Sequence, residues 1–322
     1  MRIASIDIGT NTILLLIAEI HNSKIIPLKE EFRIPRIGKS LSTTQKIEEE
    51  SQIQLIQILN DYKQIALDCG VEKIICGGTA AFRDAKNSDE VIQRAKIETG
   101  LKIKILSSEQ EAVCTFLGGI SNFQEFFDMD FTVIDIGGGS TEIVTGNLNE
   151  IKFLKSYNVG AVILKDLYFN SFPYQVSEEI IYEKLKFIFK DELTKSNSIV
   201  IAVAGTPTTI ASIYYNQKVF DEKQVDKTYL NLDFLNNLIS KFYNLSTQQI
   251  RKIFPSIAEG REDVILPGTI ILKFIIDKLK VDGFYVSARG IRYGLIINEL
   301  MNYREGFWTK VGLRKLASSL FG

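Results

Sequence analysis

The sequence predicts an α/β protein with two domains, and three observations support this fold class. The chain has 322 residues and 45% hydrophobic content, which is enough to bury a large core divided between two domains. Short β-branched strand patterns alternate with longer helical patterns. A turn of unusual composition joins two strand patterns twice, at Asp7 and at Asp135, which lie 128 positions apart. Each half of the chain therefore opens near its start with the same strand, turn and strand.

The first turn, residues 7–12, reads Asp-Ile-Gly-Thr-Asn-Thr. Strand patterns flank it at residues 3–6 and 13–20, and a third strand at 24–28 completes a meander. Taken alone, an Asp-x-Gly turn between strands is most often an ordinary tight turn. Its recurrence in the second half favours a shared functional role instead.

The second turn, residues 135–142, reads Asp-Ile-Gly-Gly-Gly-Ser-Thr-Glu between strand patterns at 131–134 and 143–145. Three consecutive glycines let the backbone take positive φ and bring several backbone N–H donors within reach of one anion, with no Cβ in the way. Phosphate fits such a loop. Because Asp135 would repel phosphate directly, the pattern also indicates a divalent cation, or a water bound to one, between the two.

The remaining elements alternate along both halves. In the first half a helix capped by residues 42–44 ends near residue 70, and in the second half the longest helix begins at residue 261. Further strands are expected at residues 73–76, 102–106, 150–157, 199–203 and 283–286, and further helices at 88–98, 107–117, 160–169, 177–193, 232–243, 246–253, 261–279 and after 290. The amphipathic, basic segment 307–321 is expected to be a helix that packs on the first half.

Composition excludes several classes of function. The net charge of −1 gives no general attraction to nucleic acid or to a membrane. His21 is the sole histidine, which argues against a histidine-based metal centre and against a Ser-His-Asp triad. The three cysteines show no metal-binding spacing, and an odd number leaves one unpaired, so we expect a reducing cytoplasm. No signal peptide or membrane-spanning run is evident.

Arg83 follows a glycine turn, residues 77–79, at the carboxyl end of a strand pattern. In an α/β sheet that end is where ligands bind. An arginine on a helix is usually only a surface residue, but one at this place is well situated to hold a phosphate with two hydrogen bonds. A second basic segment, residues 33–41, contains Arg36 and Lys39, which are either parts of a solvated loop or contacts for a polyanion.

Glu109 and Glu111 lie in the first turn of the helix that opens at residue 107. Acidic side chains there interact favourably with the helix dipole, so capping alone would explain both. Residues two positions apart on a helix point about 200° from each other, so Glu109 and Glu111 do not both face one site.

Together these motifs resemble the exopolyphosphatase and guanosine pentaphosphate phosphatase (Ppx/GppA) family, a branch of the actin-like ATPase and sugar-kinase superfold. The resemblance rests on motifs in the family's order at residues 7–12, 78–87, 106–112, 133–142, 204–206 and 290–294. It implies two actin-like, ribonuclease H-like domains, each with a mixed five-stranded sheet, that face each other across a cleft. The expected domains are residues 1–125 with 299–322, and residues 126–298. Longer family members continue into a helical domain that we do not find here.

The resemblance also implies roles for individual residues. Glu111 matches the catalytic base, whereas Gln110 replaces the glutamate that precedes it in the family pattern, and Arg83 matches a phosphate-binding arginine. The expected phosphate-binding residues are Gly9, Thr10, Asn11, Thr12, Gly137, Gly138, Gly139, Ser140, Thr141, Gly205 and Thr206, and the expected ligands of Mg²⁺, or of another divalent cation, are Asp135, Asp7 and Glu142. For Gly205 and Thr206, a plain strand-to-helix turn remains the alternative.

The activity implied is release of terminal orthophosphate from inorganic polyphosphate, from guanosine pentaphosphate, or from both. Guanosine tetraphosphate is an expected inhibitor and a homodimer is the expected assembly; the role of Arg289 stays open. Two alternatives are an ATPase or kinase of the same superfold and a catalytically weak sensor of guanosine tetra- or pentaphosphate. An ATPase or kinase would need a developed nucleoside pocket, and only residues 204–206 indicate one.

Overall fold

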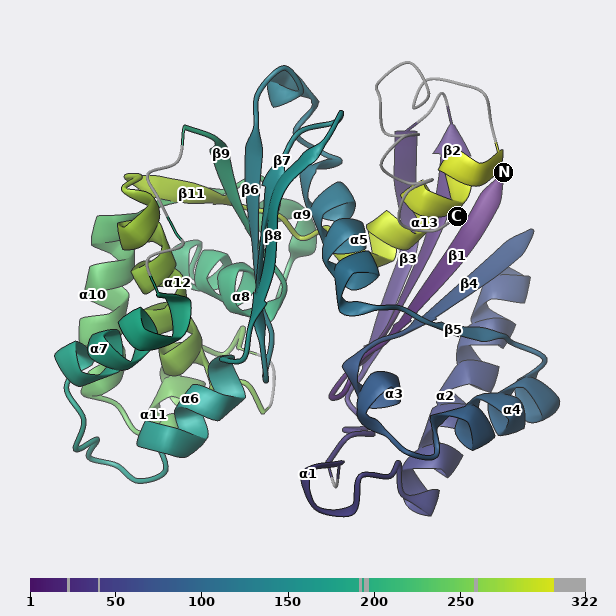
Figure 1. The fold of residues 1–322 in the computed structure, drawn as a ribbon, viewed down its shortest axis with the longest axis horizontal. Helices are drawn as coiled ribbons and strands as arrows, with labels where there is room; N and C mark the ends of the chain where they lie inside the picture. The colour runs from purple at the N-terminus through teal and green to yellow at the C-terminus, as the bar shows by residue number, and fades with distance from the viewer. Residues whose placement is uncertain (22–23, 40, 191–192, 194–196, 258–259, 304–322) are drawn as a thin grey trace. The chain divides into compact units, whose positions relative to one another are not determined.

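The computed structural model describes residues 1–21, 24–39, 41–190, 193, 197–257 and 260–303, and it consists of two compact α/β units (Figure 1). Unit 1 comprises Met1–Gly118 and the chain from Ile291, and unit 2 comprises Gly119–Gly290. The contacts thus divide the chain after residues 118 and 290, where we expected 125 and 298. The expected helix at 307–321 lies outside the described residues.

Unit 1 contains a five-stranded mixed sheet in the order β3-β2-β1-β4-β5. Its strands are β1 (Arg2–Ile8), β2 (Ile13–His21), β3 (Lys24–Arg33), β4 (Lys73–Gly78) and β5 (Ile103–Ile105). Strands β1, β2 and β3 form the expected antiparallel meander, and β4 and β5 add in parallel to β1. Strand β3 is longer than expected, so Arg33 belongs to the strand and not to the following loop.

Helices cover both faces of this sheet because both faces are apolar. On one face α2 (Glu49–Asp68) and α4 (Ser88–Thr99) enclose a core with alternate residues of β1 such as Ile6 and Ile8. On the other face α13 (Ile291–Tyr303) packs on β1, where Ser5 donates a hydrogen bond to the carbonyl of Arg292. Shorter helices α1 (Leu41–Thr44) and α3 (Ala80–Asp84) follow the turns, and α5 (Ser108–Ile120) leads toward unit 2. The residues expected to cap a helix, 42–44, instead belong to α1, and the helix expected after them is α2, which begins at Glu49.

Unit 2 repeats this strand order and adds one strand. Its described sheet runs β10-β11-β9-β6-β7-β8, so β6 (Phe131–Ile136), β7 (Thr141–Gly146), β8 (Ile151–Tyr157), β9 (Ile199–Val203) and β11 (Gly283–Val286) correspond to β1–β5. The expectation of five strands was wrong for this unit. The sixth, β10 (Tyr229–Asn231), is a three-residue edge strand antiparallel to β11, too short to produce a periodic signal.

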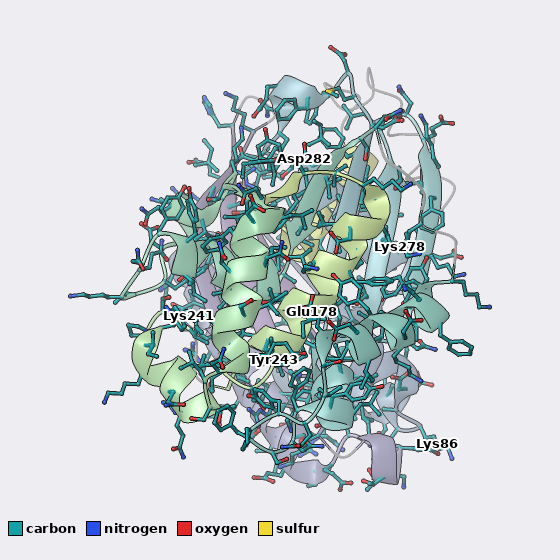
Figure 2. All side chains as sticks on the ribbon, turned by 90° about the vertical axis from the view of Figure 1, so that its left-hand side faces the viewer. Lys86, Glu178, Lys241, Tyr243, Lys278 and Asp282 are labelled. Atoms are coloured by element: carbon teal, nitrogen blue, oxygen red, sulfur yellow. The ribbon has the colours of Figure 1, made fainter. Side chains whose placement is uncertain are left out.

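The helices of unit 2 are built around α12 (Ile265–Leu279), most of whose residues are buried. Figure 2 looks onto the helical side of this unit, with Tyr243 at the end of α10 and Glu178 at the start of α7. The other helices are α6 (Ala161–Tyr168), α7 (Glu178–Phe189), α8 (Gly205–Tyr214), α9 (Glu222–Val225), α10 (Leu232–Tyr243) and α11 (Thr247–Ile253), with a 3-10 turn at Gln124–Phe126. Helix α12 begins four residues later than expected, and residues 260–264 remain outside it. No helix among the described residues is long and apolar enough to cross a membrane.

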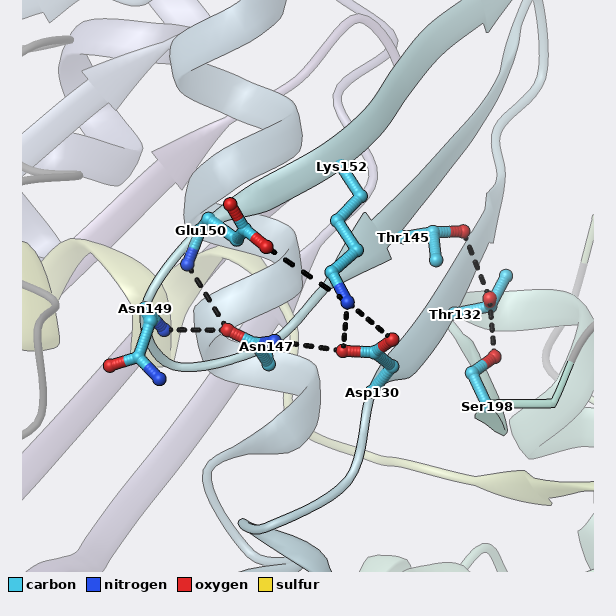
Figure 3. A network of polar contacts seen from close by, with 8 residues as sticks. All are labelled: Asp130, Thr132, Thr145, Asn147, Asn149, Glu150, Lys152 and Ser198. Carbon is cyan, nitrogen blue, oxygen red and sulfur yellow. Dashed lines mark hydrogen bonds and ion pairs between the residues drawn. The ribbon is translucent and has the colours of Figure 1, made fainter.

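Polar contacts fix the register at the base of the second hairpin (Figure 3). Thr132 and Thr145 are cross-strand partners whose hydroxyls lie 2.9 Å apart, and the Thr132 hydroxyl also contacts Ser198 at 2.6 Å. Beside them Lys152 donates to both carboxylate oxygens of Asp130, at 2.9 and 2.7 Å. These pairs hold β6, β7 and β8 in one register, because a slip by one residue would reverse every side chain of the hairpin.

Candidate active site

The two turns have the same hydrogen-bonded geometry. In the first, the Gly9 amide donates to the Thr12 carbonyl at 2.9 Å, and in the second the Gly137 amide donates to the Ser140 carbonyl at 2.9 Å. The strand register matches as well, since Asp7 pairs with Leu14 and Asp135 with Glu142, each seven positions later. The predicted duplication of the hairpin is confirmed, with the offset of 128 residues conserved in every one of these pairs.

The carbonyl groups of both turns bond to neighbouring backbone. In unit 2 the carbonyls of Gly137 and Gly138 accept from the first amides of α6, Ala161 and Val162, each at 2.9 Å. In unit 1 the carbonyls of Thr10 and Asn11 accept from the amides of Gly38 and Arg36, each at 3.0 Å. Because these acceptors are used, they contribute less repulsion to an anion bound at the turn.

The second turn does not use the positive φ that its three glycines allow. Among the described residues the glycines with positive φ are Gly70, Gly100 and Gly260, and none belongs to the second turn. What the turn requires is close backbone approach. A Cβ on Gly137 would lie 3.2 Å from the Ser140 carbonyl oxygen, and a Cβ on Gly160 would overlap the carbonyls of Gly137 and Gly138. Gly139 has open space at its Cβ position.

Asp7 is the last but one residue of β1, just before the first turn, and its carboxyl group is buried. Its Oδ1 atom has no hydrogen-bond partner. The pKa of Asp7 is raised to about 7, mainly by burial and then by the charge of Glu111, while the charge of Arg292 lowers it. A buried oxygen without a donor favours a group that the chain does not itself supply, such as a cation or a bound water.

Glu111 lies beside Arg83, as expected for a site. Nη1 of Arg83 donates to Glu111 Oε2 at 2.6 Å and to the Leu106 carbonyl at 2.9 Å. Both side chains are about a quarter exposed, at 25% for Arg83 and 28% for Glu111. Both bonds use Nη1, so within the described part of the chain Nη2 and Nε retain donors for a ligand.

Capping of α5 does not explain Glu111. Ser107 Oγ accepts from the Gln110 amide at 3.1 Å, and Gln110 Oε1 accepts from the Ser107 amide at 3.1 Å, which is a reciprocal capping box. Gln110 thus performs the capping role that we had considered for the glutamates. Glu109 is exposed, so of the two acidic residues it is Glu111 that shares a site with Arg83 and Asp7.

Asp135 and Glu142 are directly opposite each other on β6 and β7 and are both half-buried. Like charges at such a cross-strand position are destabilising. Glu142 Oε1 accepts from Ser156 at 2.6 Å, which offsets part of this. The described residues contain no group of three or more His, Cys, Asp or Glu side chains that could hold a metal. A pair of carboxylates fits Mg²⁺, which keeps several waters and takes further oxygens from phosphate.

The turn at residues 204–206 is strained and lies against an arginine that the sequence reasoning missed. Ala204 has φ 72° and ψ −162°, a region that residues with a Cβ rarely occupy. A Cβ on Gly205 would overlap the guanidinium of Arg261, whose pKa is lowered by burial. Thr206 is buried and packs against Gly268. We had placed Arg261 only at the start of a helix, because nothing in its neighbouring residues indicates the contact with Gly205.

The other basic candidates are engaged elsewhere. Lys39 donates to Glu50 at 2.9 Å, and the Arg289 guanidinium donates to the Ser121 hydroxyl at 3.4 Å. Arg36 has positive φ, 51°, and its amide holds the first turn through Asn11. The Lys39 side chain therefore has an ion-pair partner, whereas the contact of Arg36 is made by its backbone and its side chain is exposed.

Comparisons with known proteins identify the family and the fold of the chain. The Ppx/GppA phosphatase family model matches residues 16–303. A bifunctional 3-dehydroquinate synthase/phosphatase of Fusobacterium nucleatum is 35% identical over 315 residues, which span 93% of this chain and 46% of that protein. Exopolyphosphatase 2 of Mycobacterium tuberculosis is 25% identical over 92% of this chain and 98% of its own length. The crystal structure of the Aquifex aeolicus Ppx/GppA family member superposes with a TM-score of 0.86 at 29% identity, covering 95% of this chain and 99% of that one.

Proposed function

Because the chain belongs to the Ppx/GppA phosphatase family, we propose that it is a hydrolase that releases orthophosphate from the end of inorganic polyphosphate. The relative named exopolyphosphatase, which the chain matches over nearly its whole length, supports polyphosphate as the substrate. Guanosine pentaphosphate, with a terminal bond of the same type, is the second candidate. The strained turn at Ala204 beside Arg261 favours it, since a strand-end turn with an adjacent cation suits a nucleotide.

The ion pair between Arg83 and Glu111 is the observation that carries this proposal. A carboxylate held 2.6 Å from a guanidinium places a proton acceptor next to a phosphate-binding group. Glu111 would accept the proton of the attacking water, while the remaining donors of Arg83 would hold the terminal phosphoryl group. Glu111 then acts on the water oxygen, and Arg83 acts on the phosphoryl group whose phosphorus that oxygen attacks.

The backbone of the two turns would hold the phosphate chain. Their amides lie at turn positions without side-chain obstruction, most clearly at Gly139, where the space around the Cβ position is open. The hydroxyl and amide side chains proposed to add donors are those of Thr10, Asn11, Thr12, Ser140 and Thr141, of which Thr141 already donates to the Val159 carbonyl at 2.6 Å. We therefore expect Thr141 to support the turn more than it contacts a ligand.

Asp135 and Glu142 would hold Mg²⁺ in unit 2, and Asp7 offers a carboxylate oxygen at the equivalent place in unit 1. When bound, the ion supplies positive charge that offsets the phosphate oxygens and polarises the phosphoryl group. Asp7 and Asp135 occupy equivalent positions of the duplicated hairpin, at the last but one residue of β1 and of β6. Their own contribution is to present carboxylate oxygens next to the amides of the turns.

Measuring phosphate release tests the proposal. The purified protein is incubated with Mg²⁺ and with polyphosphate of several chain lengths, guanosine pentaphosphate or ATP, and orthophosphate is measured over time. We expect release from polyphosphate, from guanosine pentaphosphate, or from both, and little from ATP. Release from ATP alone would make the protein an ATPase, and tight binding of guanosine pentaphosphate without release would make it a sensor.

A further inference from the structure

Arg292 forms an ion pair that the proposed reaction does not use. Its Nη1 donates to Glu30 Oε2 at 2.6 Å, and the neighbouring Tyr293 hydroxyl donates to Glu30 Oε1 at 3.0 Å. Only 12% of the Arg292 side chain and 22% of the Glu30 side chain are exposed. A pair this sheltered from water interacts more strongly than the pairs on the surface.

The strand register places this pair on the same face of the sheet as Asp7. Ser5, Leu16 and Glu30 are register partners across β1, β2 and β3, and the Ser5 hydroxyl donates to the Arg292 carbonyl at 2.8 Å. Ser5 and Asp7 are two residues apart on β1, so their side chains share a face. Arg292 therefore lies on the face of the sheet that carries the Asp7 carboxyl group.

The backbone around Arg292 is held on several sides. A Cβ on Gly294 would overlap the carbonyl of Cys114 in α5, one turn after Glu111. The next residue, Leu295, packs against β4: a Cβ on Gly77 would lie 3.2 Å from Leu295 Cδ1. The start of α13 therefore contacts β1, β4 and α5, which holds the backbone of Arg292 in place, and Glu30 holds its guanidinium.

We propose that Arg292 is a positioning residue for the reaction, and that Glu30 limits its positive charge and so sets how strongly unit 1 attracts a phosphate group. This inference rests on the proposed function. Unit 1 brings together three carboxylates, Asp7, Glu30 and Glu111, and two guanidinium groups, those of Arg83 and Arg292. Loss of Arg292 makes the net charge of this group more negative, and loss of Glu30 makes it more positive.

Opposite effects of the two substitutions distinguish this role from a structural ion pair. Arg292→Gln removes a positive charge beside the site, so we expect the Kd for inorganic phosphate, measured by isothermal titration calorimetry with Mg²⁺, to rise about tenfold. Glu30→Gln keeps oxygen and nitrogen atoms for hydrogen bonds and removes only the negative charge, so the Kd should fall roughly threefold. Arg292→Lys keeps the charge and should restore affinity to within about twofold of the wild type.

A second Arg–Glu pair of the same unit provides the control. Arg94 and Glu49 lie 2.7 Å apart on the exposed sides of α4 and α2, and we expect Arg94→Gln and Glu49→Gln to leave the phosphate Kd unchanged. Thermal melting confirms that each variant is folded. If Arg292→Gln and Glu30→Gln weaken phosphate binding alike, or if neither changes it, the proposal is overturned.

Turnover separates this inference from the proposed function. With polyphosphate as substrate, KM should shift in the same opposite directions while kcat stays within about threefold of the wild type. A protein that shows the opposite shifts in phosphate binding but hydrolyses no phosphoanhydride would overturn the proposed function, and with it the role of Arg292 in the reaction, and would leave only the effect of the Glu30–Arg292 pair on phosphate binding. An active enzyme without these shifts would overturn this inference alone.

Discussion

At the scale of single residues, Asp7 combines features that do not favour stability. Its carboxyl group is buried, and the Oδ1 atom has no hydrogen-bond partner. The charges that act on it are those of the Glu111 carboxylate and the Arg292 guanidinium. Residues under such strain are commonly found at functional sites, where a ligand relieves it. The stability of the protein without divalent cation should therefore depend on the ionisation of Asp7.

Replacement of Asp7 by asparagine tests this. The pKa of Asp7 rises from 3.8 in the unfolded chain to about 7 in the folded protein. Between these values the folded state keeps a proton that the unfolded state has released, so the free energy of unfolding falls as pH rises, by roughly 2–4 kcal/mol in all. In chelator, Asp7→Asn should therefore be more stable than the wild type in urea at pH 8, and the difference should shrink at pH 5.

The matched control is Asp61→Asn on the exposed surface of α2, which should change stability little and equally at both pH values. A stability difference between Asp7→Asn and the wild type that is the same at pH 5 and pH 8 would contradict the assignment of a raised pKa to Asp7.

At the scale of elements, the glycine turn and α6 form one structure. The backbone of Gly160 lies against the carbonyls of Gly137 and Gly138, and the first amides of α6 donate to those carbonyls. Short contacts to backbone are relieved only by moving the turn or the helix. Gly139, in contrast, has no atom within 4 Å of the position that a Cβ would take.

We expect Gly160→Ala and Gly139→Ala to separate folding from binding. Gly160→Ala should lower stability by about 1–3 kcal/mol, seen as a fall of several degrees in Tm, because the added methyl group overlaps backbone. Gly139→Ala should leave Tm unchanged but raise KM for polyphosphate, because the methyl group enters the space proposed for phosphate. A normal Tm for Gly160→Ala would contradict the observed packing, and a normal KM for Gly139→Ala would remove the tip of the turn from the site.

The facing carboxylates of β6 and β7 lead to a prediction about metal. Without a cation, the repulsion between Asp135 and Glu142 is expected to cost about 0.2–1 kcal/mol. Glu142→Gln should therefore raise Tm slightly in chelator. It should also abolish the increase in Tm that Mg²⁺ gives the wild type, because ligand binding to the folded state stabilises it. If Mg²⁺ raises the Tm of the variant as much as that of the wild type, Glu142 is not a ligand.

At the scale of the whole molecule, the features that repeat were predictable and those that depend on distant contacts were not. The duplicated hairpin follows from local sequence, since both turns and both strand registers recur after 128 residues. Arg83 and Glu111 were assigned to one site only through motif resemblance, and their ion pair was not predicted, because the residues lie on different elements. The edge strand β10, the contact of Arg261 with Gly205 and the pair of Glu30 with Arg292 were not found.

Physical reasons explain these differences. A strand pattern needs several residues to show its period, and Tyr229–Asn231 has three. Gly160 and Gly294 resemble ordinary helix-associated glycines in sequence, and only the folded chain shows which backbone atoms approach them. Composition allows positive φ in the glycine run at 137–139, but the turn does not use it, and the tight turn and the packing of α6 are what exclude a side chain.

The account as a whole depends on Glu111 as the proton acceptor, and one comparison of two variants tests this most directly. Glu111→Gln and Glu109→Gln make the same chemical change two residues apart on one helix, and only the first removes a carboxylate that contacts Arg83. In phosphate release from polyphosphate, we expect Glu111→Gln to lower kcat by about 10²–10⁴ with binding largely kept, and Glu109→Gln to match the wild type. Near-normal turnover by Glu111→Gln, or equal losses in both variants, would contradict the account.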